Sequence, residues 1–441
     1  TYTFADANEA WQLAIHQGNS WVARKIHDNE VVYIPNNFMM DKVDLNDKET
    51  WRIEPKQVER AIKDGRHDAK NPIFNWRKVV AQESVRHERW NANRNVLAWK
   101  FLTGVEYNDP EKFPYSAVID RKLGVKDAMA LLRLHEDYIG QDQELYHSKS
   151  EGICRTTSHD SIVYNLTADP TLTEAWKTLG RPCQSVFVPL YPLAGPAKGT
   201  AFTDPATATK EHFAGTPAMF DYRADFTPHS VFSASNNAID YLRGDELAKR
   251  TQLIQAEEDK FMKDRAAVTK KAAGLKGEER TKFLHDYNQK SYDHVLKIMQ
   301  AENARLMPNK VKILADVVKA DGDGTVDFAL LGAKGHEVLS ANMEATRAGM
   351  SANQLNSTRQ WKNFAPAEKM VYKDVNNDGI TDVVFTFKAK DVTKGAVAGA
   401  AMDLWLYTQI NGHRVTGFDV VPVENDKVKM NKGARDGKGL L

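Results

Sequence analysis

Trp11-Gln-Leu-Ala-Ile15 and the two runs that follow it, Trp21-Val-Ala-Arg-Lys-Ile26 and Glu30-Val-Val-Tyr-Ile34, decide the fold. Each run alternates apolar with mixed positions, which is the period of a β-strand. Gly18-Asn19-Ser20 supplies a turn between the first two runs. Pro35 ends the third run because it cannot donate to a sheet ladder, and polar amides follow it. The sequence therefore predicts a three-stranded meander in a sheet whose earlier strands lie elsewhere.

Three blocks of the chain carry a resemblance to a known enzyme family. The first holds Phe4-Ala-Asp6-Ala-Asn-Glu9-Ala-Trp11, Trp21-Val-Ala-Arg24-Lys-Ile-His-Asp28, Pro35-Asn36 and Asp44-Leu-Asn46-Asp47. The second is Cys154-Arg155-Thr156-Thr157-Ser158-His159, and the third is Trp176-Lys-Thr-Leu-Gly180-Arg-Pro182-Cys-Gln-Ser185-Val-Phe-Val-Pro189-Leu-Tyr191. In this order, over residues 1–308, the blocks resemble the dipeptidase family typified by lactobacillal dipeptidase A and related to the secernins. The members of that family are N-terminal-nucleophile hydrolases.

The resemblance implies a fold and a set of catalytic residues. The fold is α+β, an αββα N-terminal-nucleophile hydrolase sandwich that is incomplete in this chain. The nucleophile is a terminal cysteine thiol whose own α-amine serves as base, and preorganised donors stabilise the oxyanion. Asn36 matches the oxyanion position, with Asn37 as the alternative register. Arg155 matches a late arginine that holds the thiolate or the substrate carboxylate. Structural readings stay open for both positions: a turn residue for Asn36 and an ion pair for Arg155.

The chain departs from the family at its first residue. Family members start with the nucleophilic cysteine, whereas this sequence starts at Thr1 and has no cysteine near it. We therefore expect the nucleophile on a missing N-terminal segment or a separate light chain. An alternative makes Thr1 itself an N-terminal nucleophile with a free amine facing a pocket.

Composition narrows the class of protein. The 441 residues are 42% hydrophobic and 27% charged, with a formal net charge of +1, as in ordinary soluble globular proteins. The charge balance gives no reason to expect nucleic-acid or anionic membrane partners, and no apolar run of about 18 residues predicts a membrane span. The basic and aromatic stretch Arg86–Arg94 is interpreted as a solvated helix face.

The two cysteines, Cys154 and Cys183, each lie beside a predicted core strand, over residues 152–166 and 183–191. They are therefore candidate neighbours, either as a disulfide or as two buried free thiols. Neither has the setting of a nucleophile. His159 and Asp160 are interpreted as polar strand residues.

The chain divides into three parts by pattern. Residues 1–308 form the dipeptidase-like part, with helices over 55–64, 75–101 and 127–136, a loop-rich segment at 192–230, and a helical hairpin at 236–307 broken at Gly274-Leu-Lys-Gly277. Residues 309–424 are a small β-rich domain in which Asn411-Gly412 predicts a hairpin turn. Residues 425–441 are an extended tail.

The sharpest local motif is a candidate calcium loop in the β-rich domain. Calcium takes six to eight oxygen ligands, and a loop supplies them from positions 1, 3, 5, 7 and 9 with a glycine at 6. These positions are held by Asp374, Asn376, Asp378, Ile380 and Asp382, with Gly379 at the turn. Phe385 replaces the glutamate of an EF-hand and a β run follows, so the loop resembles those of FG-GAP-type repeats. An Asx-rich turn without metal is the alternative.

A weaker copy of the loop holds Asp321, Asp323 and Asp327, with Lys319 at the first position. A cation there weakens calcium binding, so this copy stays undecided. Loops of this kind suit millimolar extracellular calcium, so we expect an exported protein: periplasmic, cell-surface or secreted.

These observations predict a cysteine-type dipeptidase or similar small-amide hydrolase fused to a structural Ca²⁺-binding β domain. The alternatives are a non-catalytic exported scaffold or surface-assembly protein, and a Thr1-nucleophile amidase. Association with identical chains is left open.

Overall fold

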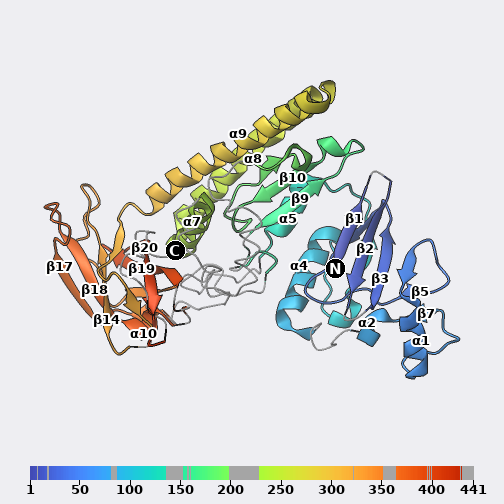
Figure 1. Ribbon diagram of the computed structural model, residues 1–441, viewed down its shortest axis with the longest axis horizontal. Helices are drawn as coiled ribbons and strands as arrows, with labels where there is room; N and C mark the ends of the chain where they lie inside the picture. The colour runs from blue at the N-terminus through green and yellow to red at the C-terminus, as the bar shows by residue number, and fades with distance from the viewer. Residues whose placement is uncertain are drawn as a thin grey trace.

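The computed structural model describes residues 1–6, 8–16, 19–80, 87–135, 152–155, 158, 160–197, 228–320, 322–350, 364–394, 396, 398, 400–427 and 429. Helices and strands both contribute strongly, so the predicted α+β class is confirmed. Figure 1 shows two mainly β regions at the ends of the molecule and long helices between them.

The N-terminal region is built on an antiparallel sheet with the strand order β1-β2-β3-β6. Its strands are β1 (Tyr2–Ala5), β2 (Ala10–Ile15), β3 (Trp21–Ile26) and β6 (Trp51–Ile53). The predicted turn between the first two long runs is confirmed, because Ile15 pairs with Trp21. The third predicted run is not part of this sheet. The free edge of β3 is taken by β6, so β4 (Glu30–Val32) pairs instead with β8 (Ser116–Val118).

Short strands and helices complete this region. A two-residue pair joins β5 (Val43–Asp44) to β7 (Ile73–Phe74). The helices are α1 (Pro55–Lys63), α2 (Trp76–Val80) and α4 (Arg89–Thr103), with a 3₁₀ turn η1 (Pro110–Lys112). Large buried side chains share one core under the sheet: Met39, Met40, Phe74, Trp76, Trp99 and Phe113.

Helix α4 bears out one interpretation of the sequence only in part. Its basic and aromatic N-terminal part was expected to be a solvated face, and Arg89 and Trp90 are exposed, but Asn91, Arg94 and Asn95 are at most 6% exposed. These residues recur at the spacing of one helix face, together with Ala98 and Trp99. The expectation missed this buried face because a polar side chain satisfied inside a fold has the same sequence signature as a solvated one. Arg94, for example, donates from Nε to the carbonyl of Gly152 at 3.1 Å.

The middle region combines a three-stranded antiparallel sheet with helices. The sheet order is β11-β10-β9, from β9 (Ser161–Asn165), β10 (Glu174–Thr178) and β11 (Val188–Leu190), and α5 (Val125–Leu132) packs beside β9. The 3₁₀ turns η2 (Pro170–Leu172) and η3 (Pro192–Ala194) flank these strands.

The strands predicted over 152–166 and 183–191 are shorter than expected. Residues 152–155 form a bend because the Cys154 amide donates to the carbonyl of Leu134 at 3.0 Å, which ties this segment to the end of α5. Residues 182–185 form a turn because Arg133 donates to the carbonyls of Pro182 and Ser185. Asp160 therefore precedes β9, and His159 lies outside the described residues.

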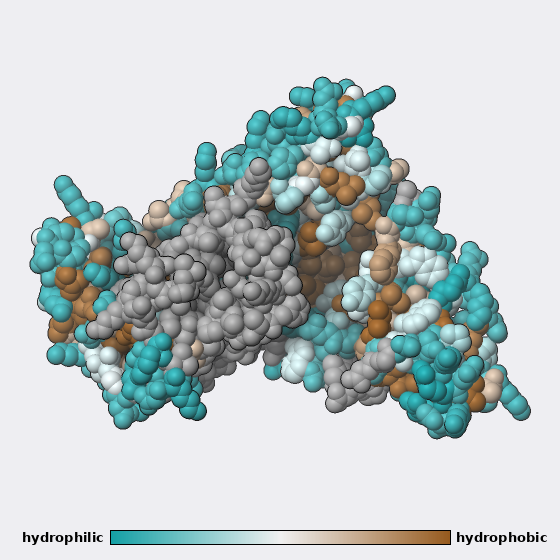
Figure 2. Space-filling view, in the orientation of Figure 1, coloured by the Kyte–Doolittle hydropathy of each residue, from teal (hydrophilic) through white to brown (hydrophobic). Residues whose placement is uncertain are grey.

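Two long helices form the predicted hairpin. Helix α8 (Gly244–Gly274) ends and α9 (Gly277–Leu306) begins at the predicted break, after α7 (Pro228–Leu242). Ion pairs join Arg250 to Glu302 and Arg305 to Glu246, so the two helices run antiparallel. In Figure 1 they lie side by side along the top of the molecule, and Figure 2 shows hydrophilic side chains over their far end.

The C-terminal region is a sandwich of two sheets around one core. One sheet has the order β12-β14-β18-β17 and the other β13-β20-β19-β15-β16. Their bounds are β12 Val311–Ile313, β13 Val318–Lys319, β14 Thr325–Leu330, β15 Arg347–Met350, β16 Ala365–Pro366, β17 Lys369–Lys373, β18 Asp382–Lys388, β19 Ala400–Ile410 and β20 His413–Glu424, with a short helix α10 (Ala389–Val392). Asn411 and Gly412 have positive φ of 50° and 78° between β19 and β20, which confirms the hairpin turn.

Helix α7 connects the middle region to this sandwich. The Tyr241 hydroxyl donates to the carbonyl of Thr408 at 2.7 Å, and Arg414 donates to the carbonyl of Tyr241 at 2.8 Å. Trp405 and Tyr407 of β19 share a buried cluster with Ile239 of α7. Among the residues that the structure describes, no helix has the length and apolarity needed to cross a bilayer.

Candidate functional site

The segment that follows β4 holds Asn36 at the protein surface. Phe38 packs edge-on against the buried ring of Trp76, with centroids 4.9 Å apart, and Met39 and Met40 enter the core. These anchors leave Asn36 exposed at the bend. Asn37 is half-buried, and its Nδ2 donates to the carbonyl of Phe38 at 3.3 Å. Asn36, the predicted oxyanion residue, is therefore accessible to a ligand. The amide of Asn37, the alternative, is instead hydrogen-bonded to the neighbouring backbone.

Arg155 lies in the bend at 152–155 and is half-buried. Its backbone forms a tight turn, because the Arg155 amide donates to the Ser158 hydroxyl at 3.2 Å. Gly152, at the start of the bend, accepts from Arg94 of α4. The charge of Arg94 also acts on the phenol of Tyr33, whose pKa burial raises well above its ordinary value. Arg94 thus hydrogen-bonds to the segment that carries Arg155 and lies near Tyr33, which precedes Asn36.

Thr1 is exposed at the start of edge strand β1, all four residues of which are exposed. It lines neither of the two cavities described below. The structure thus brings Thr1, Asn36 and Arg155 into no shared contact within its described residues, and their catalytic roles stay predictions.

The first candidate calcium loop folds around its own carboxylates. Asp374 accepts from the amides of Asp378 and Gly379, and Asp378 accepts from the amide of Ile380. These backbone hydrogen bonds, that from Gly379 above all, hold the pKa of Asp374 below its ordinary value. Asn376 Nδ2 lies 2.8 Å from Asp378 Oδ2, so three oxygen-bearing side chains meet at one exposed turn.

Asp382 occupies a different setting from the other predicted ligands. It is fully buried, and its two oxygens accept from the amides of Gly332 and Val375, each at 2.8 Å. This carboxylate anchors the loop to the sandwich. Of the second loop, Asp321 lies outside the described residues, Asp323 is 98% exposed, and Asp327 accepts from the Thr386 hydroxyl. Lys319 pairs with Asp426 at 2.7 Å.

The two cysteines meet, as predicted. Cys154 Sγ and Cys183 Sγ are 3.4 Å apart and form no disulfide. Burial raises the pKa of the Cys183 thiol well above its ordinary value, and the Cys154 thiol raises it further. His135, which follows the C-terminal end of α5, joins them: one ring nitrogen and the two sulfurs lie within 4.8 Å of one another. No local motif pointed to His135, because the three residues come from segments that are distant in the sequence.

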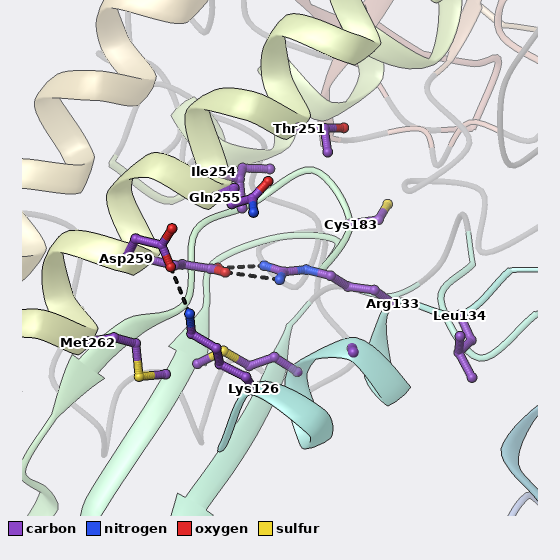
Figure 3. A pocket seen from close by; sticks show the side chains of 12 residues that line it. Lys126, Arg133, Leu134, Cys183, Thr251, Ile254, Gln255, Asp259 and Met262 are labelled. Carbon is purple, nitrogen blue, oxygen red and sulfur yellow. Dashed lines mark hydrogen bonds and ion pairs between the residues drawn. The ribbon is translucent and has the colours of Figure 1, made fainter. Parts of the chain in front are cut away.

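A cavity of about 410 Å³ lies beside this cluster, between α5 and α8. Its walls include Cys183, Leu134, Met129 and Ile254. Two ion pairs cross it: Arg133 pairs with Glu258, and Lys126 pairs with Asp259, the latter labelled in Figure 3. In Figure 2 hydrophobic side chains lie in a hollow over the same part of the molecule.

A second cavity, of about 870 Å³, is polar and lies in the N-terminal region. Glu30 and Arg24 pair there through two hydrogen bonds of 2.7 and 2.9 Å. The Arg24 guanidinium also lies over the rings of Trp51 and Tyr115. The charged groups of Arg24 and Glu30 are therefore held by contacts within the protein.

Comparison with known proteins agrees with the blocks read from the sequence. The model of peptidase family C69 matches residues 1–213. A probable dipeptidase of Latilactobacillus sakei is 23% identical over 198 residues, which cover 43% of this chain and 42% of the relative. For probable dipeptidase B of Lactococcus lactis the identity is 27%, over 52% of this chain and 47% of the relative. A dipeptidase of Bifidobacterium longum is 20% identical, over 63% and 56%.

The matched stretches thus span about half the length of these curated relatives. The family match ends before α7, and it includes Asn36, Arg155 and both cysteines. The resemblance to the dipeptidase family that the three sequence blocks carry is confirmed, because residues 1–213 match the model of peptidase family C69.

Proposed function

We propose that the protein containing this chain is a dipeptidase, which hydrolyses dipeptides or similarly small amides through a cysteine nucleophile supplied by a segment outside these 441 residues. The observation that carries the proposal is the family match over residues 1–213, which contains the predicted site residues Asn36 and Arg155. The described cysteines lack the setting of a nucleophile, since burial favours the neutral thiol at Cys183.

The proposed residues have roles that their chemistry allows. The attacking thiolate forms a carbon–sulfur bond to the substrate carbonyl, whose oxygen takes the negative charge. Asn36 donates an amide N–H to that oxygen without adding a charge of its own. The amine then leaves with a proton, and water hydrolyses the thioester to release the acid. Arg155 binds the terminal carboxylate of the substrate through its guanidinium fork.

The αββα sandwich is part of the same proposal. Two antiparallel sheets, β1-β2-β3-β6 and β11-β10-β9, lie within the region of the family match. These two sheets would contribute strands to the two β layers of the sandwich. A crystal structure of the longer protein tests this arrangement, and sheets that fail to stack in two layers around Asn36 and Arg155 would contradict it.

The activity test uses the longer protein and a panel of dipeptides. For Asn36→Ala we expect kcat to fall about 100- to 1,000-fold with little change in KM, which is the effect of losing one oxyanion donor. For Arg155→Ala we expect KM to rise, with partial rescue by Arg155→Lys. Asn108→Ala is the matched control, because Asn108 is also an exposed asparagine of the N-terminal region.

The same assay separates the alternatives. Intact mass and N-terminal sequencing first identify every chain and its first residue. A longer or second chain that starts with cysteine, with activity lost on Cys→Ser at that position, supports the proposal. Activity lost only on Thr1→Ala would establish the Thr1 amidase instead, and no hydrolysis of any substrate would leave the scaffold function.

We also propose that the loop Asp374–Asp382 binds Ca²⁺ and that the protein works outside the cytoplasm, where calcium is abundant. Three oxygen donors at one exposed turn and the positive φ of Gly379 support this. Calcium should raise the melting temperature of the wild-type chain, and Asp378→Asn should remove that rise. Glu344→Gln, which neutralises an exposed carboxylate in the same region, should keep it. An equal rise in both variants would refute binding at this loop.

A further inference from the structure

The cluster of His135, Cys154 and Cys183 has no part in the proposed hydrolysis. Its three donors come from three separate segments: the end of α5, the bend at 152–155 and the turn at 182–185. One nitrogen and two sulfurs lie within 4.8 Å of one another, and Cys154 is fully buried. Donors from three segments that are distant in the sequence meet only where tertiary contacts hold those segments together.

The backbone around the cluster is fixed by contacts that do not involve the donors' side chains. The Cys154 amide donates to the carbonyl of Leu134, the residue before His135. Gly152 lies so close to the same segment that an added Cβ would meet Leu134 O at 3.2 Å and the Cα of His135 at 3.1 Å. A backbone fixed in this way limits where the three donor side chains can lie, as a metal site requires.

The turn that carries Cys183 is fixed from the other side. Arg133 of the α5 C-cap donates through Nε to the carbonyl of Pro182 at 2.7 Å and through a terminal nitrogen to that of Ser185. Glu258 of α8 in turn holds Arg133 through both of its oxygens. The end of α5 thereby sets the position of both cysteine segments, and His135 follows directly on that end.

The distances fit a tetrahedral zinc centre. With Zn–S of about 2.3 Å, two ligating sulfurs lie about 3.8 Å apart, and a ligating nitrogen lies about 3.6 Å from each sulfur. The Sγ–Sγ distance of 3.4 Å is within a few tenths of an ångström of that separation, and the histidine nitrogen lies within 4.8 Å of both sulfurs.

We propose that His135, Cys154 and Cys183 bind a zinc ion, with water in the fourth position. Thiolate and imidazole ligands select zinc over magnesium or calcium, which prefer oxygen. Cys183 lines the cavity between α5 and α8, so the ion lies beside that cavity and its water is supplied from there (Figure 3). Both thiols lose their protons to solvent when the metal binds, so binding is tighter at higher pH.

The first test measures the protein isolated without chelator or reductant. We expect one zinc per chain by elemental mass spectrometry and two free thiols per chain on titration in denaturant with the metal removed. A Cys154–Cys183 disulfide in the isolated protein would overturn the proposal, and so would two free thiols without stoichiometric metal. Neither result depends on hydrolase activity, so a failed dipeptidase assay leaves this test unaffected.

The second test replaces zinc by cobalt, whose bonds to thiolate give a charge-transfer absorption in the near ultraviolet. One equivalent of Co²⁺ should produce that band in the metal-free reduced chain. His135→Gln and Cys183→Ser should each weaken binding by more than the roughly 10- to 100-fold lost when an outer-shell partner is mutated. His413→Gln, at an exposed histidine of β20, is the control and should bind as the wild type does.

Circular dichroism of each variant shows whether it is folded, and Cys183→Ser keeps the test informative if the fully buried Cys154 does not tolerate replacement. An affinity for Co²⁺ in folded His135→Gln equal to that of the wild type would remove histidine from the site and contradict the three-ligand proposal. The calcium loop contains no sulfur, so cobalt bound there gives no such band.

Discussion

Arg181 and Arg250 are the two arginines of the described residues that are at most 1% exposed, and Arg181 holds the better-defined ion pair. Its guanidinium pairs with the carboxylate of Asp240 on α7, and it donates to Asn237 Oδ1 at 2.6 Å. Gln184 donates to the second oxygen of Asp240 at 2.7 Å. Removing a charged group from water is costly, so such a pair is tolerated only where each ion keeps its partner. This network attaches α7 to the turn that carries Cys183.

Replacing Arg181 by methionine should therefore lower the free energy of unfolding by about 3–5 kcal/mol, because Asp240 stays buried without its counter-ion. Chemical denaturation monitored by circular dichroism measures the change. Lys177→Met is the matched control: its pair with Asp160 is largely exposed, so its loss should cost less than about 1 kcal/mol. Equal effects of the two substitutions would contradict the assigned burial.

Glu30 predicts how stability depends on pH. Burial alone would raise the pKa of its carboxyl, but hydrogen bonds from the Arg24 side chain and the His27 amide outweigh it and hold the pKa below the ordinary value. A carboxylate whose pKa is depressed by folding stabilises the protein above its unfolded pKa, near 4.3, and loses that contribution as pH falls. Wild type should therefore lose more stability between pH 5 and pH 3 than Glu30→Gln.

The measurement is a series of denaturation midpoints over this pH range. Ser116 also donates to Glu30, so Ser116→Ala reports the effect of a lost neutral donor with the carboxylate retained. If Glu30→Gln and wild type lose stability in parallel, the carboxylate is not responsible for the acid sensitivity.

At the scale of elements, Gly274 and Gly277 in the turn between α8 and α9 should respond in opposite ways to replacement by alanine. Gly277 has φ +52°, whereas Gly274 has no positive φ, and an added Cβ meets nothing within 4 Å at either position. Gly277→Ala should cost about 1 kcal/mol because an L side chain is strained at that φ. Gly274→Ala should instead gain up to about 1 kcal/mol, since alanine prefers the helix. Thermal melts of both variants test this opposition.

The elements that sequence predicted well are those with local causes. The break at Gly274–Gly277 and the hairpin turn at Asn411-Gly412 depend on backbone preferences of a few neighbouring residues. The pairing of strands does not depend on local preferences. The edge of β3 pairs with β6, some 20 residues after β4 in the sequence, so β4 pairs with β8 instead of joining the predicted meander. The burial of Arg94 likewise depends on Gly152, which lies 58 residues away.

The candidate sites divide in the same way. A calcium loop is contiguous, so its donors can be read from spacing alone. The cluster around Cys154 is not, because His135 lies 19 residues before it and Cys183 lies 29 residues after it in the sequence. The sequence predicted that the cysteines would be neighbours only through the two strands that flank them, and it offered no comparable guide to the histidine.

At the scale of the whole molecule, α7 is buried on two sides. Phe232 near its start shares the core of the middle region with Trp176 and Ile254. Tyr241 near its end packs against Tyr407 of the β-sandwich, with ring centroids 5.1 Å apart. Because α7 packs into both cores, unfolding of one core removes packing contacts from the other. We therefore expect the middle region and the sandwich to unfold as coupled units.

Tyr241→Ala tests this coupling, because it removes a buried ring and the hydrogen bond to Thr408 and should cost about 3–5 kcal/mol. Hydrogen exchange should then become faster in β19 and β20 as well as in α7, because the sandwich loses a surface against which it packs. Phe232→Ala, on the same helix and of similar cost, should raise exchange first in the middle region, since its ring contacts that core. Identical exchange patterns in the two variants would mean that α7 and both regions unfold as one cooperative unit. If β19 and β20 stay protected in Tyr241→Ala, the sandwich is stable without its contacts to α7, which would contradict the coupling.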